Sequence, residues 1–250
     1  ADERMNDPAD RNARPYSQPL SKLLQPDQAL TTRQLEDRRL IHRHESVRKH
    51  ADAFRELRTR LLSLSGSLHG ENRNFVTLVA PVRHGCGGSF VARNLAAAFA
   101  FDESKQALLI DCDATHPAQG DALRVPAENG GLIDYLEDES ITLSDIVYPT
   151  GIPRLQLIPC GRSRETPGES FSSFRMHAMI DSLRAHQGNR HLILDGAPVQ
   201  GSPDARILSD LAGGHADRTW GQRIREYTEP LVLILDDFAM REHTAMHADD

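Results

Sequence analysis

Residues 75–99 carry the pattern that most constrains this chain: an apolar run, a glycine-rich loop and a second apolar stretch. The first run, residues 75–80, predicts a buried strand, and residues 90–99 predict a helix. The loop between them reads Pro81-Val82-Arg83-His84-Gly85-Cys86-Gly87-Gly88-Ser89. A strand, a glycine-rich loop and a helix N-terminus in this order surround an anion with backbone N–H groups and the positive end of a helix dipole. The segment therefore predicts a phosphate-binding loop.

This loop lacks the lysine that such loops normally carry. They end in Gly-Lys followed by Ser or Thr, and here Gly88 stands at the lysine position, directly before Ser89. Losing a charge that is aimed at a transferring phosphoryl group costs on the order of a hundredfold or more in rate. Arg83 offers a partial replacement, although a guanidinium seldom substitutes well for an ammonium. We expect weak binding of nucleotide or phosphate at Arg83, Gly85, Cys86, Gly87, Gly88, Ser89 and Phe90.

Composition sets milder limits. The chain has 250 residues, which suits one α/β domain with extensions, and a net charge of −7, which gives no global basic footprint for nucleic acid. No apolar run approaches the roughly 20 residues that span a bilayer. The three cysteines form no Cys-x-x-Cys pair, which is typical of a reducing compartment.

Short apolar runs alternate with helical patterns through the middle of the chain. The runs 75–79, 107–110, 155–158 and 191–194 predict strands of a mostly parallel sheet covered on both faces. The predicted fold is therefore a doubly wound α/β domain with an N-terminal helical extension, in which residues 31–64 form two amphipathic helices. We divide the chain into a disordered leader (1–28), a helical extension (29–66), the α/β domain (67–211) and an atypical C-terminal segment (212–250).

Acidic residues end two of the predicted strands. Asp111 and Asp113 follow one strand and Asp195 follows another, at the edge where parallel sheets bind ligands. The three carboxylates are candidate catalytic groups, and Asp111 and Asp195, with the Ser89 hydroxyl, are candidate ligands for Mg²⁺. The alternative is that each Asp only caps the turn or helix that follows it.

The order of these motifs resembles the bacterial tyrosine kinases of capsule and exopolysaccharide synthesis, a branch of the deviant P-loop ATPases that includes MinD and ParA. The resemblance covers about residues 51–211 and implies a P-loop NTPase-like fold, binding of ATP and Mg²⁺, a membrane polysaccharide co-polymerase as partner and a cytoplasmic place at the inner membrane. The deviant P-loops carry a signature lysine at the position where this chain has Arg83. Asp52, Arg55 and Arg58 resemble the family's oligomerisation motif, which implies a homo-oligomeric ring; the alternative is a solvated helix face. The motifs are 85–89, 108–113, 131–136, 157–161, 195–199 and 204–208.

The departures from this family keep three functions open. Gly88 replaces the lysine, Thr115 replaces an arginine, and the four tyrosines are scattered rather than clustered in a tail. The first function is a regulatory, pseudokinase-like protein of polysaccharide synthesis. The second is an active ATP-dependent tyrosine kinase that uses Arg83. The third is a transposition-helper fusion or an inert fragment, because about residues 211–250 resemble part of the helper ATPase of insertion-sequence transposition.

The sequence contains two further patterns, a possible additional strand and a possible zinc site. Residues 231–235 predict a strand that could join the sheet, followed by Asp236 and Asp237, which we interpret as a solvated turn. His84, Cys86, Cys112 and His116 lie on two loops that the fold should bring together, and they offer a zinc site whose spacing matches no standard zinc module.

Overall fold

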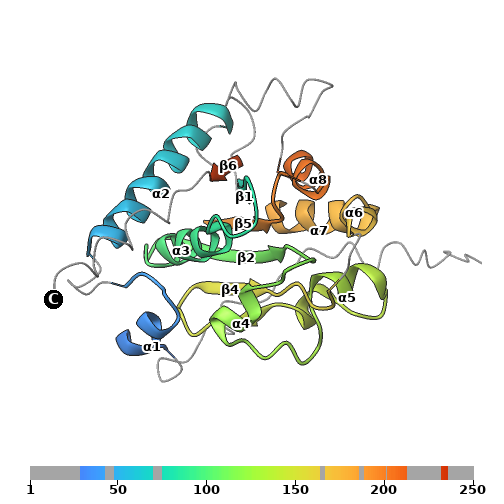
Figure 1. Ribbon diagram of the computed structural model, residues 1–250, viewed down its shortest axis with the longest axis horizontal. Coiled ribbons are helices and arrows are strands. Elements are labelled where there is room, and N and C mark those ends of the chain that lie inside the picture. Colours follow the sequence, from blue (N-terminus) through green and yellow to red (C-terminus); the bar gives the residue numbers. More distant parts are fainter. Residues whose placement is uncertain are drawn as a thin grey trace, which may run out of the picture.

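The computed structural model describes residues 29–42, 48–69, 75–163, 167–185, 189–200, 202–212 and 232–235. The predicted leader and most of the C-terminal segment, including Asp236 and Asp237, lie outside these residues. Figure 1 shows a central sheet with helices on both sides. No helix in the described ranges is both long enough and apolar enough to cross a membrane.

The sheet has six strands in the order β3-β4-β2-β5-β1-β6. All neighbouring strands pair in parallel except β3 and β4. This confirms the predicted doubly wound, mostly parallel sheet and the four predicted strands. The strands are β1 (Val76–Pro81), β2 (Gln106–Cys112), β3 (Tyr148–Pro149), β4 (Leu155–Ile158), β5 (Arg190–Gly196) and β6 (Val232–Leu235).

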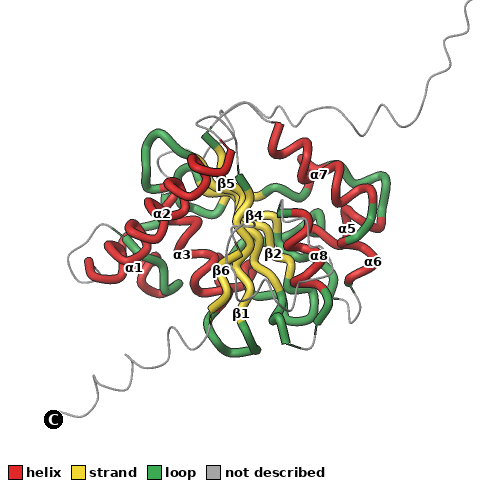
Figure 2. Tube along the Cα trace, turned by 90° about the horizontal axis from the view of Figure 1, so that it is seen from above, coloured by secondary structure: helices red, strands yellow, loops and turns green. Residues whose placement is uncertain are grey.

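Helices cover the two faces in separate layers, as Figure 2 shows. On one side lie α1 (Thr32–Asp37), α2 (Arg48–His69) and α3 (Gly88–Ala100), and on the other α5 (Leu132–Glu137), α6 (Gly168–Phe171), α7 (Phe174–Ala185) and α8 (Asp204–Leu211). The remaining helices are α4 (Gln119–Leu123) and a 3₁₀ turn over Leu143–Asp145.

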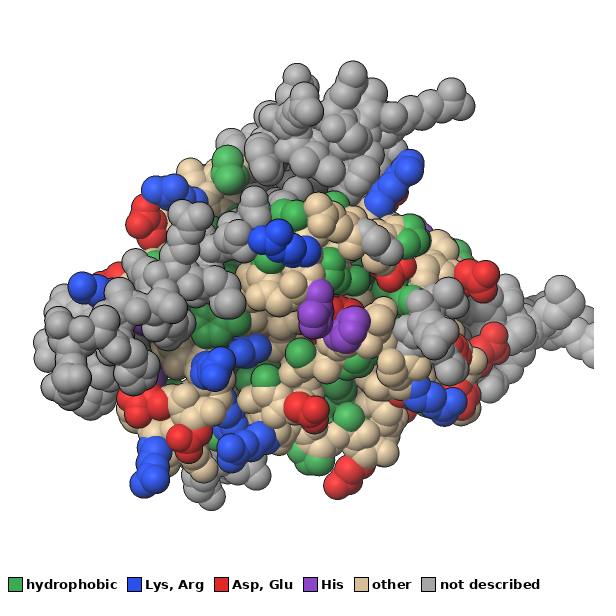
Figure 3. Space-filling model, viewed as in Figure 1, with side chains coloured by type: hydrophobic (Ala, Val, Ile, Leu, Met, Phe, Trp, Pro, Cys, Tyr) green, Lys and Arg blue, Asp and Glu red, His purple; other side chains and the backbone are tan. Residues whose placement is uncertain are grey.

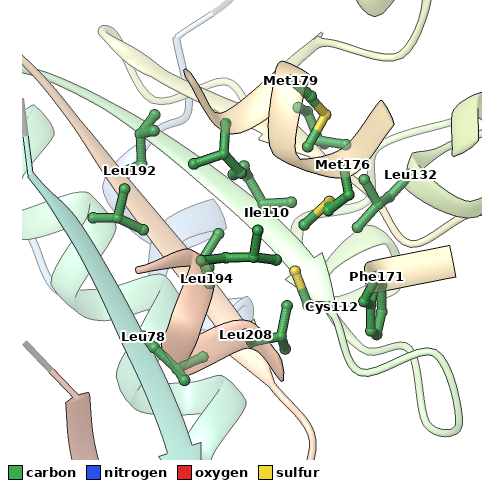
Figure 4. Packing of buried hydrophobic residues seen from close by; sticks show 14 of the residues in the cluster. Leu78, Ile110, Cys112, Leu132, Phe171, Met176, Met179, Leu192, Leu194 and Leu208 are labelled. Atoms are coloured by element: carbon green, nitrogen blue, oxygen red, sulfur yellow. The ribbon is translucent and has the colours of Figure 1, made fainter. Parts of the chain in front are cut away.

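The central strands are buried on both faces because each face carries its own hydrophobic cluster. Along β2, Leu108 and Ile110 belong to the cluster on the α5–α8 side, whereas Leu109 belongs to the cluster on the α3 side. Figure 4 shows Ile110 packed among side chains from β5, α7 and α8. Alternation along a strand sends successive side chains to opposite faces, so a strand that is apolar throughout requires two helical layers.

Asn94 of α3 fixes the N-terminal extension to the domain. Its side chain is fully buried, accepts a hydrogen bond from the Ile41 N–H (2.7 Å) and donates to the Arg39 carbonyl (3.0 Å). These bonds satisfy backbone groups that follow α1, while Phe54 of α2 meets Phe90 of α3 edge to face, with ring centroids 6.1 Å apart. The extension is therefore part of the α3 layer.

His191, on β5, links stability to pH. Its imidazole is buried between Phe75 and Phe99, with ring centroids 4.7 and 4.2 Å away, and neither ring nitrogen has a hydrogen-bond partner. Burial lowers the pKa of His191 from 6.5 to about 3, with a further contribution from Lys105. Between pH 6.5 and 3 the His191 imidazole is therefore protonated in the unfolded chain but neutral in the folded chain. Stability is lost as the pH falls through this range.

We expect His191→Leu to reduce this acid sensitivity. At pH 4.5 the native histidine costs roughly 2 kcal/mol relative to pH 7, and the variant should lack that loss. Urea unfolding at several pH values measures the difference. His177→Gln, which changes an exposed histidine on α7, is the control and should leave the pH dependence unchanged. Equal acid sensitivity in His191→Leu and the parent chain would contradict the explanation.

Candidate functional site

The glycine-rich loop joins β1 to α3 at the C-terminal edge of the sheet, as the sequence predicts. Gly85 (φ 85°) and Gly87 (φ 82°) adopt left-handed backbone conformations that favour glycine. The Gly87 carbonyl accepts a hydrogen bond from the Val91 N–H (3.0 Å), so α3 begins directly at the end of the loop. The strand, the loop and the helix N-terminus thus have the arrangement that suits a phosphate.

The lysine position is closed by a second residue, Pro81. A Cβ atom added to Gly88 would lie 2.8 Å from both Cδ and Cγ of the Pro81 ring. Side-chain carbons do not approach this closely, and a proline ring cannot rotate away as a flexible side chain would. A side chain at position 88 would therefore require the Pro81 ring or the loop to shift.

Asp111 and Asp195 lie side by side at the ends of β2 and β5, where they are register partners in the parallel ladder. Both are fully buried. Asp111 accepts hydrogen bonds from the N–H groups of Asp113 (3.3 Å), Ala118 (3.0 Å) and Gln119 (2.9 Å). Burial raises the pKa of Asp111, and these hydrogen bonds oppose the shift. The capping alternative thus describes the contacts of Asp111, which holds the start of α4.

Asp195 has an oxygen without a partner. Its Oδ2 accepts a hydrogen bond from Gln119 Nε2 (2.7 Å), while Oδ1 is buried and unbonded, as is Oε1 of Gln119. Burial, and then the neighbouring Asp111, raise the pKa of Asp195. Gln119 also donates to the Ser89 carbonyl (2.8 Å), so it joins the acidic strand end to the start of α3.

Gln119 is absent from the predicted site. The signal in the sequence is faint: a carboxamide two residues after Pro117, in a loop that begins at the Asp111 strand end. Only the fold shows that this side chain reaches β5.

The geometry permits a limited test for Mg²⁺. The unpartnered Oδ1 of Asp195 and the half-buried Ser89 are oxygen donors of the kind that Mg²⁺ prefers, so they fit the ion. Both oxygens of Asp111 are already engaged by backbone N–H groups. Within the described ranges, no three His, Cys, Asp or Glu side chains are grouped closely enough to hold a metal. An ion here would depend on Asp195 and Ser89.

The same test bears on the zinc hypothesis. Cys112 is fully buried in the sheet, and burial raises the pKa of its thiol well above the ordinary value, so the thiolate that zinc requires is disfavoured. His84 and His116 do meet, with ring centroids 4.4 Å apart, and both are exposed. Figure 3 shows a pair of His side chains in contact at the surface. Asp113 accepts a hydrogen bond from the His116 N–H (3.0 Å) beneath it. The four predicted ligands do not form a metal centre.

The residues of the predicted oligomerisation motif are used differently from one another. Asp52 and Arg55 form an ion pair on the exposed side of α2. Arg58 instead donates to the Ala98 carbonyl (2.8 Å) and lies 3.7 Å from Asp102, and its side chain is only 16% exposed. Asp52 and Arg55 are exposed and paired with each other, whereas Arg58 ties α2 to the end of α3.

Among known proteins, the chain has a relative in sequence that is a bacterial tyrosine kinase. No protein-family model matches the chain. The tyrosine-protein kinase CpsD of Streptococcus agalactiae is 27% identical over 184 residues, which cover 73% of this chain and 76% of CpsD. The chain is thus related in sequence to a bacterial tyrosine kinase.

Solved structures confirm the fold. The chimerical protein CapA2B2 superposes with a TM-score of 0.60 at 22% identity, covering 82% of this chain and 98% of that protein. The kinase domain of the Escherichia coli tyrosine kinase ETK gives a TM-score of 0.60 at 21% identity and covers 74% of each chain. The predicted doubly wound α/β fold is therefore confirmed.

A second relationship covers a shorter part of the chain. A putative ATP-binding protein in an insertion sequence of Mycobacterium tuberculosis is 80% identical over 55 residues. The match spans 22% of each protein, so this chain covers about a fifth of that relative. The predicted resemblance to an insertion-sequence ATPase is confirmed as well.

Proposed function

We propose that this chain is a tyrosine-kinase-like regulator of capsular or exopolysaccharide synthesis that binds nucleotide weakly and transfers phosphate inefficiently. The missing lysine carries the proposal, because Gly88 stands at its position and a side chain there would meet the Pro81 ring at 2.8 Å. The phosphate loop keeps its shape while its main cation is excluded, which favours binding over turnover. The relationship to CpsD supports a role beside a membrane polysaccharide co-polymerase, and the exposed Asp52 and Arg55 suit assembly with further copies of the chain.

The proposal assigns a separate role in nucleotide binding to each group of residues in the site. Backbone N–H groups at the start of α3 would receive the phosphate groups, and Arg83 would supply the remaining positive charge on the loop. Asp195 and Ser89 would hold Mg²⁺, which when bound neutralises phosphate charge. Gln119 orients Asp195 through the 2.7 Å hydrogen bond.

The test is Mg²⁺-dependent binding of a fluorescent ATP analogue to the parent chain, Gly88→Lys, and Pro81→Ser with Gly88→Lys. We expect weak binding by the parent and no gain in Gly88→Lys, which should also melt earlier because its Cβ meets the Pro81 ring. The double variant should bind at least about tenfold more tightly, equivalent to about 1.4 kcal/mol, because the new ammonium then has space. A gain in Gly88→Lys alone would contradict the role of Pro81, and no gain in either variant would contradict an otherwise intact site.

The active-kinase alternative makes a different prediction. If Arg83 replaces the lysine, the parent chain should bind nucleotide tightly and release phosphate, and Arg83→Ala should abolish turnover. That result would overturn the regulatory proposal.

The insertion-sequence match favours a third candidate, a transposition-helper fusion. DNA-stimulated ATP hydrolysis would support it. Against it, β6 is hydrogen-bonded to β1 within the kinase-like sheet, in register from Leu78–Val232 to Pro81–Leu235. This strand thus completes the kinase-like domain instead of forming a separate nucleotide site.

A further inference from the structure

Four arginines from three separate segments gather at one side of the α3 layer. Arg38 and Arg39 follow α1, Arg93 lies on α3 and Arg124 follows α4. We call these four residues the arginine cluster. The Asn94 side chain, which donates to the Arg39 carbonyl (3.0 Å), brings the end of α1 to α3 beside Arg93.

The end of α4 packs on the same side of the sheet as the end of α1. Leu123, directly before Arg124, belongs to the same buried cluster as Leu35 and Leu40 on either side of the end of α1. Like charges then face one another across the segments: Arg124 lowers the pKa of Arg38, and Arg39 lowers that of Arg93, in each case after the larger effect of burial.

Among the residues that the structure describes, no carboxylate pairs with a guanidinium group of the cluster. No carboxylate among the described residues lies within ion-pair distance of any of the four, and the nearest acidic influences are Asp37 on Arg38 and Asp195 on Arg93. Nε and Nη1 of Arg38 and Nε of Arg93 are buried without a hydrogen-bond acceptor. Buried donors without a partner each cost about 1–3 kcal/mol, so an anion that accepts from them would be bound favourably.

The backbone shows a second cost at the same residues. Both α1 and α4 end in a left-handed residue, Arg39 (φ 53°) and Arg124 (φ 52°). The N–H of Leu40 bonds to the Leu35 carbonyl (2.9 Å) and that of Val125 to the Gly120 carbonyl (2.9 Å), which is the hydrogen-bond pattern of a helix end normally completed by glycine or asparagine. An arginine at this conformation costs about 1 kcal/mol. Both helix ends therefore carry arginine where glycine or asparagine would be more favourable, and both arginines belong to the arginine cluster.

We propose that the arginine cluster is a binding site for a small anion that carries two or more phosphate groups. Guanidinium groups match phosphate oxygens through paired N–H donors, and several such groups around one ligand suit a chain of phosphates better than a single carboxylate. The net charge of the chain is −7, so this concentration of positive charge does not follow from composition. Figure 3 shows Lys and Arg side chains around a pair of His side chains, several of them at the lower left with Asp and Glu side chains among them.

The cluster is distinct from the phosphate loop but near it. Arg93 lies five residues after the start of α3, and Arg124 follows a helix whose first residue, Gln119, contacts Asp195. At about 1.5 Å per residue, each arginine is roughly 8 Å along its helix from the candidate nucleotide site. The four arginines are thus separate residues from those of the loop, although Asp195 of the candidate nucleotide site acts on Arg93.

The experiment is calorimetric titration of inorganic triphosphate into the full chain and the double variant Arg39→Asn with Arg124→Asn. Asparagine suits both left-handed helix ends, so the variant should fold with an unchanged or slightly higher melting temperature while losing two cations. We expect affinity for triphosphate to fall at least tenfold. The control, Arg33→Gln with Arg60→Gln, removes the same charge from exposed positions and should bind within twofold of the parent.

A variant of the phosphate loop separates this site from the proposed nucleotide site. Gly85→Val forces a β-branched residue to φ 85° and should spoil the loop, yet leave triphosphate binding at the cluster. A parallel titration with ATP shows whether a nucleoside adds affinity to the phosphate chain. Unchanged affinity in the asparagine variant, or binding that is lost only in Gly85→Val, would overturn the cluster as a site and leave the proposed function standing. Absence of triphosphate binding by the parent chain would overturn it too.

Discussion

Gly131→Ala should destabilise the protein by roughly 3–5 kcal/mol, a large effect for one substitution, because the added methyl group would overlap backbone atoms. A Cβ at this position would lie 2.3 Å from the Pro159 carbonyl oxygen and 2.4 Å from the Gly161 nitrogen. Both contacts are with backbone, which cannot move aside as a side chain can. The contact is close because the loop after β4 accepts hydrogen bonds from the start of α5, from Leu132 N–H to the Pro159 carbonyl (2.8 Å).

Chemical unfolding of Gly131→Ala beside Gly120→Ala measures this effect. In the control the new Cβ lies 3.8 Å from Pro159, an ordinary contact, and alanine favours the α4 helix by up to about 1 kcal/mol. We therefore expect Gly120→Ala to be neutral or slightly stabilising. A Gly131→Ala protein within about 1 kcal/mol of the parent would show that the loop after β4 can move away from α5.

Removal of β6 should have the second large effect. In a chain that ends at residue 212, the backbone groups of Leu78 to Pro81 that pair with β6 lose their partners. We expect a loss of roughly 3 kcal/mol and a melting temperature about 10 °C lower, from several missing ladder hydrogen bonds. An exposed apolar edge strand also templates pairing between chains, so the truncated protein should associate as its concentration rises.

The control for this truncation is a chain that ends at residue 240, which keeps β6. Light scattering coupled to size exclusion and thermal unfolding should show this control to behave like the full chain. Equal stability and equal mass for the chains ending at 212 and 240 would mean that β1 does not depend on the added strand.

Much of the architecture could be predicted because it rests on local signals. The apolar runs that form β1, β2, β4 and β5 are continuous and short, which is the pattern of strands buried on both faces. The glycine-rich loop was equally clear, since Gly85 and Gly87 occupy the left-handed conformations that the motif requires. The prediction of a strand near residues 231–235 is confirmed by β6. In the extension, the two expected helices are present, but α1 has only 6 residues whereas α2 has 22.

The site was predicted less completely because its decisive contacts join distant residues. Asp111 and Asp195 converge as expected. However, Asp111 accepts hydrogen bonds from backbone N–H groups at the start of α4, and Asp195 accepts one from the Gln119 side chain. The roles assigned to these carboxylates in catalysis and metal binding, and the oligomeric role of the Asp52 motif, stay predictions.

The sequence by itself determined the strand-and-helix order, the phosphate loop and the missing lysine, because each is written in consecutive residues whose periodicity or glycine content has a local physical meaning. Only the tertiary structure decided that Pro81 closes position 88, that Gln119 reaches Asp195 and that arginines from three segments share one surface. These contacts depend on how the layers pack around the sheet, and side-chain packing between segments tens of residues apart leaves no periodic trace along the chain.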